Sequence, residues 1–254
     1  MSARLVVVEV NEVSPRVFRW YADRAPRSTI ARLVRNGLVE TENHDVDERG
    51  LYPAQTWATL ATGVPFEQHG VYWYADPKPA RFPLYWQLAA EAGARVGIVG
   101  TLHSSPLAEQ ASNPNIVFAL PDCFASDDAA RPERYRRFQR LNVTLTRESG
   151  RVATTRVGLK DAFVLASTPS LGVRLRSISQ LGSIAMGVLL RRTSRERVRS
   201  GQFILTADMF EHLARKHDPD LAVLFTNHVA SVMHRYWYAT FPDDFDRPLY
   251  DEAW

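Results

Sequence analysis

The chain has 254 residues, 45% of them hydrophobic, so it can bury a sizeable core and is not expected to be disordered. Its formal net charge is +3, with acids mixed among the bases, and this balance does not indicate a nucleic-acid partner. The single Cys123 excludes an intrachain disulfide framework and a cysteine-based zinc cluster. With no secretory signal pattern at its start, we expect a soluble, cytoplasmic protein.

The first hundred residues predict strands alternating with helices. A β-branched run predicts a strand over 5–10, and a short apolar run predicts a second strand over 95–99. Between them, apolar spacing and helix-end signals predict helices over 15–21, 28–36, 56–62 and 83–92.

The pattern changes between residues 106 and 199, where turns rich in proline and aspartate surround an arginine-rich helix near 132–141. A helix over 202–217 and a continuously apolar strand over 221–225 follow, as in a parallel sheet. We therefore predict an α/β fold with a mostly parallel sheet flanked by helices and interrupted by a helical insertion. The predicted domains are a core of residues 1–105 and 202–254 and an inserted, cap-like region of residues 106–201.

The last residues, 242–254, carry acids and a proline as the starts of helices do, but the sequence stops before a helix is completed. We therefore expect the sequence to be a fragment.

Two strand ends carry polar residues that could bind a ligand. Asn11 and Glu12 follow the first strand, and ligands of α/β proteins bind at that edge of the sheet, although an asparagine there is more often a turn former. Asn227, His228 and His234 follow the last strand, and imidazole is a common zinc ligand. These histidines are equally compatible with roles in the core or at the surface.

A segment rich in threonine runs from Pro53 to Gly70. Thr56 stands at a predicted helix start, where the positive end of the helix dipole would stabilise an alkoxide or a bound phosphate. The alternative is that Thr56 is only the N-cap, since threonine is among the favoured capping residues.

In this order, the three segments resemble the phosphodiesterase and nucleotide pyrophosphatase branch of the alkaline phosphatase superfamily. The strongest match is Pro-x-x-Thr-x-x-x-Thr-x-x-Thr-Gly-x-Pro-x-x-x-His-Gly over residues 53–70. The resemblance covers roughly residues 5–105 and 202–240 by the order of elements, and it implies an alkaline-phosphatase-like core.

The resemblance implies a mechanism that uses two divalent ions, usually zinc. It implies that Thr56 is the nucleophile and that a metal ion, zinc or alternatively manganese, lies near Asn11 and His234. Asn227 and His228 are further candidate ligands, and Glu9 and Glu12 could also compensate for missing ones. The family's first metal-binding aspartate falls on Asn11 and that of its Asp-x-x-x-His motif falls on Ala230, so two anionic ligands are replaced. His69 matches a His-Gly turn, which we take as structural. The family's later metal-binding strand would lie beyond Trp254.

Two functions follow from these residues. The first is a metal-dependent hydrolase of small-molecule phosphate esters or diesters. The second is a catalytically degenerate member that binds rather than cleaves, with the basic insertion as its contact surface.

A stretch from Val173 to Arg199 combines apolar residues with arginine. It is compatible with a cap, with contact with an anionic membrane surface, or with a charged, solvated helix pair, and we favour the last. Its arginines are Arg174, Arg176, Arg191, Arg192, Arg195, Arg197 and Arg199.

Overall fold

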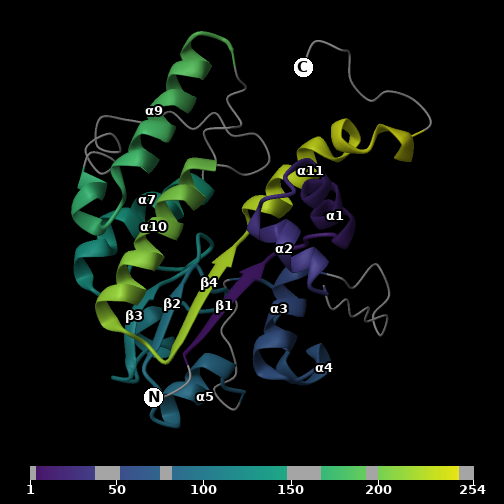
Figure 1. Ribbon diagram of the computed structural model, residues 1–254. Helices are drawn as coiled ribbons and strands as arrows, with labels where there is room; N and C mark the ends of the chain where they lie inside the picture. Colours follow the sequence, from purple (N-terminus) through teal and green to yellow (C-terminus); the bar gives the residue numbers. More distant parts are fainter. Residues whose placement is uncertain (1–3, 38–51, 75–81, 148–166, 193–199, 246–254) are drawn as a thin grey trace. The chain divides into compact units, whose positions relative to one another are not determined.

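The computed structural model describes residues 4–37, 52–74, 82–147, 167–192 and 200–245 (Figure 1). The chain divides into two compact units, the first made of residues 1–9 and 52–226 and the second of residues 10–51 and 227–254. The range that we expected to be an inserted region thus lies within the first unit. Within the described ranges, none of the helices is long and apolar enough to cross a membrane.

The first unit is built on a parallel sheet of four strands, which confirms the predicted α/β class. The strands are β1 (Leu5–Val10), β2 (Val96–Val99), β3 (Ile116–Leu120) and β4 (Leu221–Thr226). Their order is β1-β4-β2-β3, and the four arrows point the same way in Figure 1. β2 pairs with both neighbours in parallel, with Val96 opposite Ile116 on one side and Leu221 on the other.

The inner strands of this sheet are covered on both faces. Every residue of β2 and β4 is buried, as expected of continuously apolar parallel strands. Successive side chains of a strand point to opposite faces, so Ile98 joins one hydrophobic core and Val99 joins the other. The outer strand β1 differs, because Val6 and Val8 are largely exposed.

The helices of the first unit supply those two cores. One core includes Tyr135, Met209 and Leu213, and the other includes Trp86 of α5. The helices are α3 (Pro53–Thr62), α4 (Phe66–His69), α5 (Tyr85–Glu91), α6 (Leu107–Gln110), α7 (Arg136–Arg147), α9 (Leu175–Leu189) and α10 (Ser200–His217), with short 3-10 turns η2 (Glu133–Tyr135) and η3 (Thr168–Leu171).

Strand β3 was not predicted from the sequence, and it lies inside the 106–201 range. Its run Ile116-Val-Phe-Ala-Leu120 is as apolar as the other inner strands and is flanked by turn residues. Phe118 packs against the backbone of Gly97, where even a single added carbon would lie 2.0 Å from the ring. Glycine in β2 therefore makes room for the β3 side chain, and the sheet extends into the range expected to be an insertion.

The second unit is helical in its described part. It contains α1 (Pro15–Arg24), α2 (Thr29–Arg35), α11 (His228–Thr240) and the 3-10 turn η5 (Pro242–Asp244). Arg16 of α1 donates to both carboxylate oxygens of Asp244 at 2.8 and 2.7 Å, and its guanidinium lies 4.0 Å from the ring centre of Phe241. The predicted helices over 15–21 and 28–36 are therefore present, and α1 is tied to the end of α11. Of the range 242–254, residues 246–254 lie outside the described part.

Candidate functional site

Thr56 lies in the first turn of α3, and the alternative that it caps this helix is wrong. The helix begins at Pro53, and Tyr52 is the N-cap residue. The backbone N–H of Thr56 already bonds to the Tyr52 carbonyl at 3.1 Å, so Thr56 is the fourth helical residue rather than the cap. Its side chain is exposed, and its hydroxyl donates to the same carbonyl at 3.2 Å.

The second threonine of the motif and His69 hold the segment together. The Oγ1 of Thr59 lies 3.0 Å from Nε2 of His69, and the N–H of Val71 donates to Nδ1 of His69 at 3.0 Å. Because Nδ1 accepts, Nε2 carries the proton of a neutral ring and donates to Thr59. Burial lowers the pKa of His69, while the charge of Glu67 opposes this shift. His69 has the structural role that the sequence suggested.

The third threonine and the glycines shape the turns of the same segment. Thr62 donates to the Ala58 carbonyl at 2.7 Å and accepts from the Val64 N–H at 3.2 Å. Gly63 and Gly70 end α3 and α4 in the left-handed region, with φ of 68° and 65°, which side chains disfavour. Of the three threonines in the motif, Thr56 is the exposed one.

Two side chains anchor the start of α3 at the carboxyl-terminal edge of the sheet. His103 follows β2, and its Nε2 donates to the carbonyl of Ala54 at 2.8 Å. The residue is 1% exposed, and its backbone has a φ of 64°. Trp57 packs edge-on against Phe225 of β4, with ring centres 5.1 Å apart. No sequence pattern pointed to His103 beyond its position after a buried strand.

Glu9, named above as a compensating residue, has a partner in the first unit. It is the only carboxylate of β1, it is buried, and the hydroxyl of Tyr85 donates to it at 2.9 Å. Burial raises the pKa of Glu9 despite this hydrogen bond, and burial also raises the pKa of Tyr85. This pairing favours a structural role for Glu9.

In the second unit, four of the polar residues singled out above form one group, which we call the polar cluster: Asn11, Glu12, Asn227 and His234. The side-chain amide of Asn11 donates to Oδ1 of Asn227 at 2.7 Å and approaches Oε1 of Glu12 at 3.5 Å. The other oxygen of Glu12 lies 2.6 Å from Nε2 of His234. Glu12 has a φ of 53°, which is uncommon for a residue other than glycine.

The order of the strands explains why the polar cluster assembles. β1 and β4 are neighbours in the sheet, so the residues that follow them, Asn11 and Asn227, meet at one edge. α11 starts directly after Asn227, and His234 lies two turns further on the same side of this helix.

The remaining candidates differ from the cluster. Ala230, at the position of a family aspartate, is 1% exposed and supplies no ligand atom. His228 is the first residue of α11, and burial lowers its pKa, which favours the neutral ring that a metal requires.

The polar cluster offers one carboxylate, one imidazole and two amide side chains. These donors suit a single divalent ion with mixed oxygen and nitrogen ligands better than the two-zinc centre that the resemblance implies. No group of three or more His, Cys, Asp or Glu side chains suited to a metal ion is found among the described residues. Any bound ion would also have to replace the contact between Glu12 and His234.

Thr56 belongs to the first unit and the polar cluster to the second. Comparison of the chain with models of protein families, with curated proteins and with solved structures found no match.

Proposed function

We propose that the chain is a metal-dependent hydrolase of phosphate esters or diesters with an alkaline-phosphatase-like core and Thr56 as its nucleophile. The observation that carries the proposal is the different use of the motif's threonines. Thr59 and Thr62 are engaged in building the segment, whereas the hydroxyl of Thr56 is exposed in the first turn of a helix. The hydroxyl of Thr56 also donates to a carbonyl of its own helix turn, so its exposure, rather than a lack of partners, is what supports a role as nucleophile.

In the proposed reaction the Oγ1 of Thr56 attacks phosphorus and displaces the ester alcohol. The product is a threonyl phosphate, and the hydroxyl proton of Thr56 goes to the leaving alcohol. Water then cleaves the threonyl phosphate, which releases the phosphate and regenerates the hydroxyl. The positive end of α3 favours the negative charge that accumulates in this reaction.

The residues proposed to hold a divalent ion are Glu12 and His234, with the amide oxygens of Asn11 and Asn227. When bound, such an ion neutralises charge on phosphoryl oxygens. His234 is suited to this task because 69% of its side chain is exposed, so an ion can reach it. Glu12 and His234 lie 2.6 Å apart, so they are close enough to share one ion, which would replace their direct contact.

The test is hydrolysis of aryl phosphate monoesters and diesters by the full chain with zinc or manganese. We expect Thr56→Ala to lower turnover by at least about a hundredfold and Thr56→Ser to retain part of it. Thr29→Ala is the matched control, because Thr29 is also an exposed threonine in the first turn of a helix. No product with either metal, or equal rates for Thr56→Ala and the wild type, would sink the proposal.

A second candidate is a non-catalytic binding protein, and the pairing of Asn11 with Asn227 favours it. Two neutral amides satisfy each other at 2.7 Å at the place where the family resemblance calls for an anionic ligand. A site without that charge binds a divalent ion more weakly.

Metal analysis distinguishes the two candidates. Purified protein that carries one equivalent of zinc or manganese, and loses it in His234→Ala, supports the hydrolase. Metal-free protein that binds a phosphate ester in calorimetry without turning it over supports the binding protein.

A further inference from the structure

Helix α9 of the first unit has two apolar sides. On its inner side Ser177 is buried, and Ile178 and Leu181 pack against the hydrophobic core. Leu181 also lies next to Gly201 of α10, 2.9 Å from where a side chain would begin. In Figure 1, α9 runs beside α10 and continues away from the sheet. The inner side therefore accounts for only part of the apolar residues of α9.

The outer side of α9 carries a strip of exposed apolar residues. Leu175 is 79% exposed and Leu189 is 74% exposed, and Met186 and Leu190 are more than half exposed. Gly182 follows Leu175 by seven residues, and Met186 follows Gly182 by four. Leu189 and Leu190 follow Met186 by three and four residues, so these positions lie on one side of a helix. Gly182 leaves the middle of the strip open, with nothing within 4 Å of where a side chain would begin. The large apolar residues thus stand at the two ends of this side of α9, which is roughly 22 Å long at 1.5 Å per residue.

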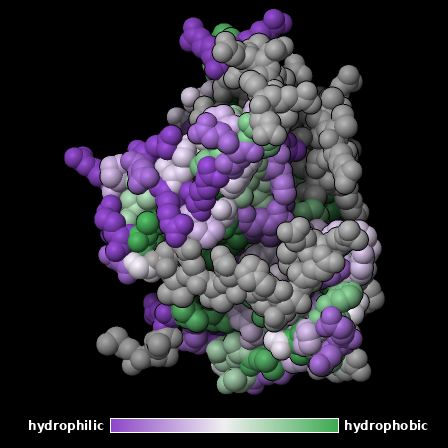
Figure 2. All heavy atoms as spheres, turned by 90° about the vertical axis from the view of Figure 1, so that its right-hand side faces the viewer, coloured by the Kyte–Doolittle hydropathy of each residue, from purple (hydrophilic) through white to green (hydrophobic). Residues whose placement is uncertain are grey.

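The charge around this strip has a single sign. From Val173 to Arg192 the sequence contains four arginines and no aspartate or glutamate. Arg174 is turned inward, where it pairs with Glu211 and Asp208 of α10. Arg176, Arg191 and Arg192 have no ion pair with any described residue. In Figure 2, strongly hydrophilic spheres surround a hydrophobic one at the top, the height at which α9 ends in Figure 1.

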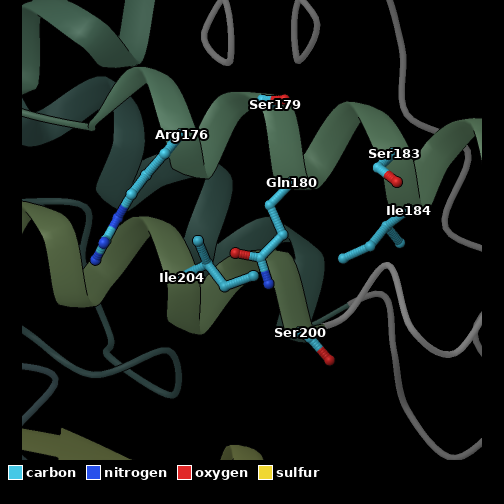
Figure 3. A pocket seen from close by; sticks show the side chains of 7 residues that line it. All are labelled: Arg176, Ser179, Gln180, Ser183, Ile184, Ser200 and Ile204. Atoms are coloured by element: carbon cyan, nitrogen blue, oxygen red, sulfur yellow. The ribbon is translucent and has the colours of Figure 1, made fainter.

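A pocket of about 470 Å³ lies between α9 and α10, and its lining is largely polar. Figure 3 shows Arg176 and Gln180 reaching from α9 toward α10, with Ser183 and Ser200 near the other end of the pocket. The flank of α9 beside the apolar strip is thus polar, as in helices that lie at a membrane interface.

We propose that the outer side of α9 binds the surface of a membrane rich in anionic lipids. The exposed leucines and Met186 would enter the boundary between head groups and acyl chains, while Arg176, Arg191 and Arg192 meet lipid phosphates. The arginines beside the strip, with no acid between Val173 and Arg192, fit an anionic lipid surface. This differs from the charged, solvated helix pair favoured above, because the outward residues of α9 are mostly apolar or small. The proposal is independent of any hydrolase activity.

The test is co-sedimentation of the full chain with vesicles of neutral phosphatidylcholine and with vesicles containing about a third phosphatidylglycerol. We expect binding to the anionic vesicles only, weakened by added salt because salt screens the charges of exposed groups. Leu189→Ser with Leu190→Ser, and separately Arg191→Ser with Arg192→Ser, should each lower the partition coefficient by at least about tenfold.

The matched control is Leu33→Ser with Arg32→Ser on α2, which changes an exposed leucine and an exposed arginine of another helix. This control should bind anionic vesicles as the wild type does. Absence of binding, equal binding to neutral vesicles, or equal losses in the control and the α9 variants would overturn the proposal. Light scattering that shows a dimer, dissociated by the two leucine changes, would overturn it in favour of contact between copies of the chain.

Discussion

The threonine segment, residues 53–70, and the polar cluster carry the same family resemblance but are built in opposite ways. In the segment, the motif residues bond to one another: Thr59 to His69 and Thr62 to the turn at Val64. In the cluster, His234 is largely exposed, and Asn11 stands where the resemblance calls for an aspartate. The motif residues of the segment thus have structural roles within it, whereas the residues of the cluster do not all match the ligands that the resemblance implies.

This difference shows how strongly each motif indicates a function. A threonine or glycine that shapes a turn has a structural reason to stand there, whether or not the chain catalyses a reaction. Thr56 and His234 are exposed, and their contacts with the Tyr52 carbonyl and with Glu12 leave them accessible, so these two positions bear most directly on chemistry. Experiments that vary the two regions separately therefore bear most directly on the proposed function.

The largest effect is expected for His69→Ala. The ring is 2% exposed and makes hydrogen bonds to Thr59 and Val71, so its loss leaves a cavity and buried polar groups without partners. We expect the free energy of unfolding to fall by about 3 kcal/mol. His234→Ala is the matched control, expected to stay within about 0.5 kcal/mol because its side chain is exposed. Urea unfolding checks both, and equal losses would remove the contrast between the regions.

Without metal, Asn11→Asp is expected to lower the free energy of unfolding by about 2 kcal/mol, because a buried carboxylate would face Glu12. Excess zinc or manganese should restore stability by about 2.7 kcal/mol at a hundredfold excess over Kd, and a chelator should reverse this. Thermal melting with and without metal measures the effect.

The control for this change is Asn11→Ala, which also loses the bond to Asn227 but adds no charge. It should not respond to metal. A melting temperature of Asn11→Asp that is indifferent to metal would indicate that the polar cluster is not the remnant of a metal site.

Much of the fold could be predicted because its signals are local. The apolar runs of β1, β2 and β4 depend on neighbours in the sequence. β3 has the same kind of signal, but the turn-rich sequence around it led us to assign it to an insertion. Its place beside β2 depends on the contact of Phe118 with Gly97, which no local pattern contains.

The site was predictable only in part, for the same reason. Thr56 and His234 were found by their spacing, and Asn11 and Asn227 by their position after strands. The pairing of Glu12 with His234 and the bond from His103 to Ala54 join residues 222 and 49 positions apart. Such contacts depend on the order of the strands in the sheet, which no single segment of the sequence determines.

A smaller effect separates the threonines within the segment. Thr59→Val removes the hydroxyl that accepts from His69, which leaves a buried N–H without a partner. The expected loss is about 1.5 kcal/mol in the free energy of unfolding. Thr56→Val, at an exposed position of the same helix, should change it by less than about 0.5 kcal/mol. If Thr56→Val were the more destabilising of the two, Thr56 would have a structural role, and its proposed role as nucleophile would lose support.

The smallest effect is a dependence on pH that arises from His69. Burial lowers its pKa in the folded state below the ordinary value of 6.5, so just below that pH the unfolded chain binds a proton that the folded chain does not. The stabilisation is therefore complete above pH 6.5 and declines as the pH falls toward the folded-state pKa. His69→Gln lacks this group, whereas the other buried histidines and Glu9 titrate alike in both proteins and cancel in the difference. Between about pH 7.5 and 5.5, the stability advantage of the wild type over His69→Gln should shrink, as measured by urea unfolding. A constant difference would mean that His69 is not held neutral by burial, and the threonine segment would then be as open to solvent as the polar cluster.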